Sequence, residues 1–309
     1  MPLCLLIENY PSLESMIIQD TTEMGHYILV LSNSFDIFRF VVTLRSSNLT
    51  ASEFKPIVIM SNHQPSPIQY ERLRIFPEIY FLKGDSKKRT HLERAGILKA
   101  DKVVLFDLSD CHDCGIDEDL VDSANILVFN LIYRLCREAG IRKNVVTCFR
   151  KQKNIKYLAY SRKESNNDLS SKDIIYNPVF ASGQVLTTMM MESILSSSPS
   201  QPYLTEIFKS FCGVPVEIPE EIVRRNNIET SNLCYFAVAD EFKDQTFGKL
   251  FQTLSETQNI IALGLLREKD GENGTFADNM PFVYTNPPMS LLLKSTDLVY
   301  CLAHPVQLS

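Results

Sequence analysis

Short apolar segments recur along the first half of the chain, and a stretch with helical spacing follows each of them. These segments are Tyr27–Leu31, Ile57–Met60, Ile79–Leu82, Val103–Phe106 and Val145–Phe149. Strands that are apolar throughout, without alternating polar positions, are typical of a parallel sheet covered by helices on both faces. Residues 26–160 are therefore predicted to form a Rossmann-like, doubly wound α/β domain.

The strongest helix signal between these strands is Ser123–Arg137, and Gly140 follows it as a stop signal. Its apolar positions include Ile126, Leu127, Phe129, Leu131 and Leu135. Residues 1–25 show no sustained period, so we expect an extended N-terminal segment or linker there.

The pattern changes after residue 160. Residues 161–173 are polar and rich in turn formers, which predicts an exposed loop. Residues 174–213 are predicted to be a crossover helix-turn-helix, in which Phe180–Leu195 is one long helix and a second helix ends at Cys212–Gly213.

The pattern of the C-terminal part predicts a mixture of strands and helix. Four strand-like segments surround one helical stretch, Phe247–Leu254; the segments are Cys234–Ala239, Ile260–Leu266, Phe282–Thr285 and Leu298–Leu302. Residues 214–309 are therefore predicted to form a smaller, peripheral α+β unit.

Composition narrows the class of protein. The 309 residues are 45% hydrophobic and 22% charged, as in an ordinary globular protein. The net charge of −6 argues against nucleic acid as a partner. No stretch approaches the roughly 20 apolar residues of a membrane span, and Pro2–Ile7 lacks the basic start of a signal peptide. Eight scattered cysteines fit a reduced, cytoplasmic setting.

The turn after the first strand argues against a dinucleotide. A pyrophosphate needs glycines at that turn, because the backbone must approach it closely. The turn here is Ser32–Asn33–Ser34–Phe35, without the G-x-G-x-x-G spacing. A nucleotide- or NAD-binding Rossmann-type protein stays open as an alternative function.

Polar residues follow the strands at the edge where open parallel sheets bind ligands. They are candidates for lining a ligand crevice: Ser32, Asn33, Asn62, Asp85 and Asp107. The alternative is that these residue types cap helices and form turns, as they prefer to do.

The most acidic stretch, Asp107–Asp122, supplies candidate metal or ion ligands. These are Asp110, Cys111, His112, Asp113, Cys114, Asp117 and Glu118. Cys111 and Cys114 have zinc-ligand spacing but lack a second pair, and the carboxylates suit sodium or calcium without matching an EF-hand. A metal-binding interaction protein is thus a further alternative; otherwise the acids cap the following helix.

Catalytic motifs are missing from the sequence. It has no G-x-S-x-G elbow, no H-E-x-x-H and no phosphate-binding G-x-x-x-x-G-K, and its five histidines are spread singly. We therefore expect that the protein is not an enzyme. Met189–Met191 is expected to serve packing or an interface rather than a metal.

Three segments carry a resemblance to a known family. Gly84–Phe106 looks like the stretch of RCK and TrkA-type domains in which Gly-Asp ends a strand and Ala-Asp opens the next. Pro178–Leu195 and Tyr284–Leu302 resemble the crossover and closing segments of the second RCK domain of Slo-family potassium channels. Phe247–Arg267 and Asp119–Tyr133 are similar to the sodium-activated, Slack-like branch.

The resemblance implies a cytoplasmic regulatory module at the inner face of a membrane. Such a module pairs with a first RCK domain and a pore module, assembles into an oligomeric, tetrameric gating ring and converts ion binding into a pull on the pore. No cofactor is required, and the candidate ions are sodium, calcium and zinc. The crossover hairpin is the expected assembly interface, with candidate residues Phe180, Val185, Met189, Ile194, Ile207 and Phe208.

Two features depart from the family pattern. The dense aspartate run of the calcium-activated branch should precede Pro178, but only Asn166, Asn167, Asp168 and Asp173 stand there, which argues against high-affinity calcium sensing at that place. The pore helices and the first RCK domain are missing, so we expect a fragment, a truncated product or a partner supplied in trans.

Overall fold

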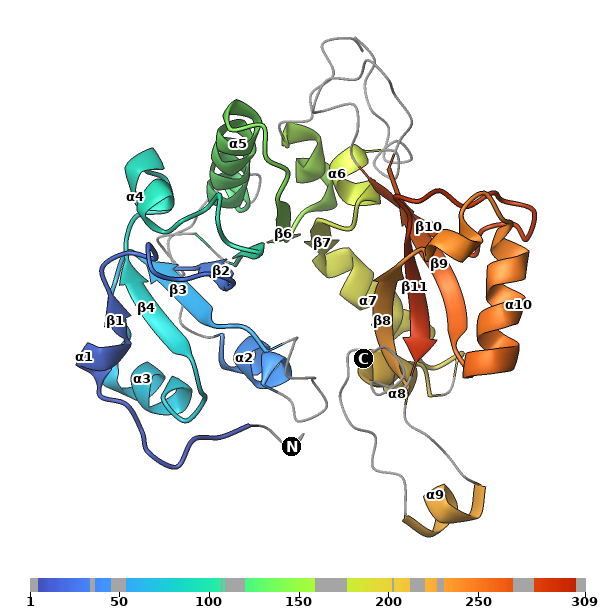
Figure 1. The fold of residues 1–309 in the computed structure, drawn as a ribbon. Helices are drawn as coiled ribbons and strands as arrows, with labels where there is room; N and C mark the ends of the chain where they lie inside the picture. Colours follow the sequence, from blue (N-terminus) through green and yellow to red (C-terminus); the bar gives the residue numbers. More distant parts are fainter. Residues whose placement is uncertain are drawn as a thin grey trace. The chain divides into compact units, whose positions relative to one another are not determined.

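The computed structural model describes residues 5–33, 37–45, 54–106, 108, 120–158, 177–201, 203–211, 220–226, 231–268 and 281–303 (Figure 1). The chain divides into two compact units. The first is formed by Leu3–Arg45 and Ala51–Ser193, and the second contains Ile194–Ser309.

Seven strands within the described residues form one parallel sheet in the first unit, in the order β1-β4-β3-β2-β5-β6-β7. Without the edge strand β1, this is the strand order of the Rossmann fold. The strands are β1 (Ile17–Ile18), β2 (Ile28–Leu31), β3 (Ile57–Ser61), β4 (Ile79–Lys83), β5 (Lys102–Leu105), β6 (Asn144–Phe149) and β7 (Val185–Thr187). The predicted α/β class is confirmed.

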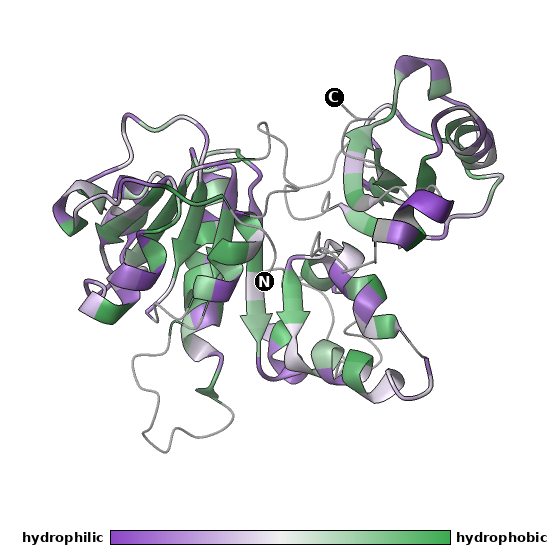
Figure 2. Ribbon diagram, turned by 90° about the horizontal axis from the view of Figure 1, so that it is seen from below, coloured by the Kyte–Doolittle hydropathy of each residue, from purple (hydrophilic) through white to green (hydrophobic). Residues whose placement is uncertain are grey.

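Helices lie on both sides of this sheet (Figure 1). They are α1 (Leu13–Met16), α2 (Phe38–Leu44), α3 (Pro67–Leu73), α4 (Arg89–Arg94), α5 (Ser123–Glu138) and α6 (Pro178–Ala181), with a 3-10 turn at Gln152–Tyr157. The side of α2 and α3 holds a buried cluster that includes Val30, Ile59 and Phe81. Figure 2 shows the sheet strands as mainly hydrophobic and the helices beside them as mixed, which fits burial of the sheet on both faces.

Helix α3 shows how the local sequence sets a helix start. Ser66 is the N-cap; its hydroxyl accepts from the Gln69 N–H, and the Gln69 side chain accepts in return from the Ser66 N–H. Pro67 occupies the first turn, where no backbone donor is needed. This capping box satisfies orphan donors of the first turn and places α3 against the sheet.

One sequence prediction for this unit was wrong. Phe180–Leu195 is not one helix: α6 ends at Ala181, Gly183 has a positive φ of 74°, and β7 pairs with β6 before α7 (Thr188–Ser197) begins. In α5, the apolar residue Leu127 is 52% exposed. The residues actually buried are Asn125, Val128, Phe129, Ile132, Leu135 and Cys136.

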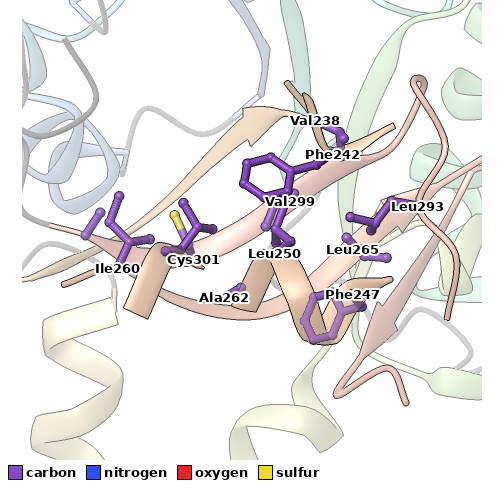
Figure 3. Packing of buried hydrophobic residues seen from close by; sticks show 12 residues of the cluster. Val238, Phe242, Phe247, Leu250, Ile260, Ala262, Leu265, Leu293, Val299 and Cys301 are labelled. Carbon is purple, nitrogen blue, oxygen red and sulfur yellow. The ribbon is translucent and has the colours of Figure 1, made fainter. Parts of the chain in front are cut away.

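The second unit contains a small antiparallel sheet, in the order β10-β9-β11-β8. Its strands are β8 (Asn232–Ala237), β9 (Ile261–Arg267), β10 (Phe282–Thr285) and β11 (Leu298–Ala303), and its helices are α8 (Leu204–Phe211), α9 (Glu220–Asn226) and α10 (Phe247–Gln258), with a 3-10 turn at Asp240–Phe242. Leu250 and Phe247 of α10 pack with Val299 and Leu265 in the core of this unit (Figure 3). The predicted smaller α+β unit is confirmed.

A buried ion pair ties the strands of this second sheet to the turn before β11. Arg267 donates to Asp297 through Nε at 2.9 Å and Nη2 at 2.6 Å, and Nη2 also donates to the Leu292 carbonyl at 2.7 Å. Asp297 has no exposed surface. The paired hydrogen bonds compensate the cost of removing both charges from water.

Candidate functional site

The ligand edge of the first unit lies between β2 and β5, where successive strands are added on opposite sides of β2. Open α/β sheets bind their ligands at such a switch point, beyond the carboxyl ends of the strands. Here Ser32 is fully buried, and its N–H donates to the Met60 carbonyl at 3.1 Å. The Asn33 side-chain amide donates to the Leu108 carbonyl at 3.0 Å. Hydrogen bonds within the protein therefore connect the end of β2 to β3 and to the residue Leu108 that follows β5.

Asn125 of α5 extends this link to the next strand. Its Oδ1 accepts from the Leu108 N–H at 3.2 Å. Its amide nitrogen lies 3.4 Å from Thr147 Oγ1 and 3.3 Å from the Cys148 carbonyl oxygen, and donates to both. The resulting switch-point network, formed by Asn33, Leu108, Asn125 and Thr147, connects β2, β5, α5 and β6.

Sequence reasoning found Ser32 and Asn33 but missed Asn125. The available signal was a polar residue on the buried side of a largely apolar helix. Such a residue needs hydrogen-bond partners, because an unsatisfied buried amide is costly.

The candidates on the neighbouring strands behave as turn residues. Asp85 accepts from the Lys87 N–H at 2.9 Å, and its own N–H donates to His91 Nδ1 at 2.9 Å. Since that nitrogen accepts, the proton of a neutral His91 ring lies on Nε2. Asn62 is partly exposed after β3. Asp107 lies outside the described residues.

Of the acids that the alternative placed at the start of α5, Asp122 is described by the structure. It stands at the N-cap position, but its side chain makes no cap hydrogen bond. Instead it accepts from the N–H groups of Arg150 and Lys151 at 2.9 and 3.0 Å and from the Asn154 amide at 2.8 Å. Asp122 thereby ties the start of α5 to the segment that follows β6.

The metal or ion site predicted for the acidic stretch stays a prediction. All its candidate ligands lie outside the described residues: Asp110, Cys111, His112, Asp113, Cys114, Asp117 and Glu118. In the part of the chain that the structure describes, no group of three or more His, Cys, Asp or Glu side chains could hold a metal ion.

The outer face of α5 borders an open groove of about 930 Å³. Its apolar lining includes Leu120, Leu127 and Tyr157, which are 56%, 52% and 56% exposed. Arg134 and Arg137 lie along the same groove. The groove is amphipathic and shallow, so it suits a macromolecular surface better than an enclosed small ligand.

Helices α7 and α8 carry the other candidate surface. Neither helix has a buried residue among those described, although both are rich in apolar side chains. Met189, Ile207 and Phe208 are 54%, 47% and 38% exposed, and Phe180 and Ile194 are partly buried. Val185 differs, because it is only 2% exposed as part of β7. The structure therefore assigns Val185 to the sheet core instead of an exposed assembly surface.

In chain order, the Rossmann-order sheet with its polar switch-point network is followed by helices with exposed apolar side chains and by a small α+β unit. Residues 22–171 match the family model described as "Calcium-activated potassium channel slowpoke-like RCK domain". Residues 222–303 match "Ca2+-activated K+ channel Slowpoke, TrkA_C like domain". Together these two matches span most of the chain, which belongs to the Slowpoke-like RCK family.

Curated relatives agree with this assignment. The chain is 23% identical over 259 residues to potassium channel subfamily T member 1 of Gallus gallus, a match that covers 79% of this chain and 20% of that protein. It is 23% identical over 305 residues to potassium channel subfamily U member 1 of Macaca fascicularis, covering 85% of this chain and 26% of that protein. The chain thus spans about a quarter or less of these relatives.

A solved structure confirms the fold. The human SLO3 gating ring superposes with a TM-score of 0.72 at 20% identity, over 96% of this chain and 51% of that one. None of the described helices is both long and apolar enough to span a bilayer.

Proposed function

We propose that the chain works as the second RCK domain of a Slo-type, ion-activated potassium channel. In this role it is a regulatory module and not an enzyme, and it lies in the cytoplasm at the inner face of the membrane. The proposal is supported by the family match and by the potassium-channel names of the relatives. It also requires partners that carry the pore and a first RCK domain.

The exposed apolar side chains of α7 and α8 carry this proposal. Met191 and Leu195 are 63% and 71% exposed on α7, and Ile207 is 47% exposed on α8. Helices with apolar side chains and no buried residue gain free energy when a partner removes them from water, at about 25 cal/mol per Å² of apolar area. The first RCK domain of a channel, arranged in a tetrameric ring, is the proposed partner.

The switch-point network supports regulation without a coenzyme. Asn33, Leu108 and Asn125 already satisfy one another across the edge where a dinucleotide would bind. No cofactor is required in this proposal. A sodium, calcium or zinc ion bound by the acidic stretch at 107–118 would act by favouring one arrangement of the assembly over another.

Association with a first RCK domain tests the proposal. The chain is co-expressed with the first RCK domain of a Slo-type channel, and the mass of the complex is measured by light scattering after size exclusion. Phe208→Glu and Met191→Glu should weaken the complex, because each places a charge in the apolar contact. The matched control is Ile68→Glu on α3, since Ile68 is 68% exposed but lies outside α7 and α8.

Two results would contradict the proposal. One is a chain that stays monomeric and captures no RCK domain. The other is equal weakening by Ile68→Glu, which would show that any added charge has this effect. The enzyme alternative is checked separately by titrating NAD and ATP into the chain in a calorimeter, where no binding heat is expected.

A further inference from the structure

Cys234 and Cys301 stand directly opposite each other on neighbouring antiparallel strands. Cys234 is on β8 and Cys301 on β11, and they are Cα partners in the register of the sheet. Directly opposite residues of an antiparallel pair project from the same face. Cys301 is fully buried in the apolar cluster that includes Leu250 of α10 (Figure 3). Cys234 packs against that cluster and is partly exposed. Both are thiols in the structure.

The ladder fixes which kind of pair they form. The Val238 N–H donates to the Asp297 carbonyl at 3.2 Å, and the register runs without a shift from Leu298↔Ala237 to Ala303↔Asn232. Hydrogen-bonded pairs alternate along such a ladder, so every second pair from Val238 onward is hydrogen-bonded. Cys234 and Cys301 therefore form a hydrogen-bonded pair.

This geometry permits a disulfide and also strains it. Hydrogen-bonded pairs have Cα atoms about 5.5 Å apart, within the range of about 4.4 to 6.8 Å that a disulfide spans. Their Cβ atoms are about 5.5 Å apart, whereas a relaxed disulfide holds them at about 3.5 to 4.5 Å. Closing the bond draws the strands together and leaves it strained, and strained disulfides are more easily reduced.

We propose that Cys234 and Cys301 are a reversible oxidation site that takes a peroxide as its oxidant. The Cys234 sulfur attacks one oxygen of hydrogen peroxide, the O–O bond breaks, and a water leaves, so that Cys234 becomes a sulfenic acid. The Cys301 sulfur then attacks the Cys234 sulfur, the S–O bond breaks, and the hydroxyl leaves as water with the Cys301 proton. Two thiols lose two electrons and one peroxide becomes two waters.

The two thiols are suited to different steps. Burial, and to a smaller extent the neighbouring Cys234, raise the pKa of Cys301 to about 12. A thiol attacks as its thiolate, so Cys301 is a poor first nucleophile and is also closed to solvent. Cys234 has partial exposure and meets the oxidant first. Cys234 is therefore the site of the first oxidation, and Cys301 is the thiol that closes the bond.

The bond would act on the edge of the second sheet. β8 is an edge strand that pairs with β11 alone among the described strands. A covalent link between them restrains β8 and lowers the opening of its backbone hydrogen bonds. This consequence concerns the second unit by itself and holds whether or not the chain regulates a channel.

Peptide mapping of the full chain tests the site. The protein is treated with hydrogen peroxide, remaining thiols are alkylated, and the protein is digested without reductant. The expected product is a linked peptide pair that contains Cys234 and Cys301, lighter by two hydrogens than the two reduced peptides, and lost after dithiothreitol. Amide exchange of β8 should slow in the oxidised protein.

Variants separate this pair from the other cysteines. Cys234→Ser should abolish the linked peptide, whereas Cys148→Ser, at an exposed cysteine of the first unit, should leave it unchanged. If Cys301→Ser fails to fold, mapping of the unsubstituted chain still decides the matter. The proposal is overturned if both cysteines are alkylated after oxidation, if Cys234 stops at the sulfinic acid, or if either links to a different cysteine.

Discussion

The Asn33 side chain donates to the Leu108 carbonyl at 3.0 Å, directly across the edge where a Rossmann sheet would bind a coenzyme. Asn125 holds the same residue from the other side by accepting from the Leu108 N–H. A single residue after β5 is therefore fixed by amides from β2 and α5. Hydrogen bonds at this edge of the sheet therefore connect β2, β5 and α5 of the first unit.

Replacing Asn125 should show how much the switch-point network contributes to the stability of the first unit. Asn125→Leu removes one acceptor and one donor, so the Leu108 N–H, Thr147 Oγ1 and the Cys148 carbonyl lose a partner. Each buried group left unsatisfied costs about 1–3 kcal/mol. We expect the free energy of unfolding, measured by urea denaturation, to fall by at least about 2 kcal/mol.

The control is Asn130→Leu on the same helix. Asn130 is more exposed and donates to the Tyr157 carbonyl at 3.1 Å. Because water can replace that bond, the loss should stay below about 1 kcal/mol. Equal losses of unfolding free energy in the two variants would show that the Asn125 hydrogen bonds contribute no more than the exposed Asn130 bond.

The fold was predictable from sequence because the strands of the first unit are buried on both faces. Leu29 of β2 and Val58 of β3, for example, are fully buried, and no polar residue interrupts the apolar runs 27–31 and 57–60 that carry the signal. β7 was missed for the opposite reason. It has three residues, Val185–Thr187, and its pairing with Thr147–Phe149 depends on a strand far away in the sequence.

The candidate site was predictable only in part. Ser32 and Asn33 follow a clear strand, so their edge of the sheet could be inferred. The role of Asn125 was harder to infer, because apolar residues occur all around α5 and the periodicity does not single out the polar position that is buried. Leu127, one of the apolar positions of this helix, is 52% exposed beside the groove.

Breaking the buried ion pair of the second unit should be costly. Arg267→Met leaves Asp297 as a charge with no exposed surface and without its partner. Removing one member of a buried pair typically costs about 3–5 kcal/mol. The expected result is a loss of that size in the denaturant-induced unfolding of the second unit.

The double variant Arg267→Met/Asp297→Leu provides the contrast. It removes both charges, so it should recover most of the loss. Double-variant stability as low as that of Arg267→Met would mean that the hydrogen bonds to the Leu292 carbonyl and from the Lys294 N–H, not the unpaired charge, dominate.

Two glycines share a positive φ, so a comparison of their alanine variants separates backbone strain from a steric clash of the new Cβ. Gly96 and Gly140 have φ of 64° and 66°. A Cβ at Gly96 would lie 2.2 Å from the Tyr27 hydroxyl and 2.4 Å from Thr21 Oγ1, whereas nothing lies within 4 Å of a Cβ at Gly140. Gly140→Ala should cost about 1–2 kcal/mol from φ alone.

Gly96→Ala should cost about 1–3 kcal/mol more than Gly140→Ala. Its Cβ displaces the Tyr27 hydroxyl, which donates within a cluster formed by Thr21 and the carbonyls of Ala95 and Gly96. Thermal unfolding of the two variants measures the difference. Equal shifts in Tm would rule out a rigid Tyr27 contact.

Asp101 should make the first unit sensitive to acid. Burial raises its pKa, but hydrogen bonds from Lys55 and His26 outweigh this and set the pKa below the ordinary 3.8. The folded protein therefore releases this proton more readily than the unfolded chain. The stabilisation is fully present above pH 3.8 and is lost as the pH falls through the folded value.

The variant Asp101→Asn isolates this effect. The difference in unfolding free energy between the unsubstituted protein and Asp101→Asn should be constant near neutral pH and shrink as the pH falls below 3.8. In a Lys55→Met background the same comparison should depend less on pH, because the Lys55 hydrogen bond and charge are gone. A difference that stays constant down to strongly acidic pH would mean that Asp101 has no depressed pKa in the folded state.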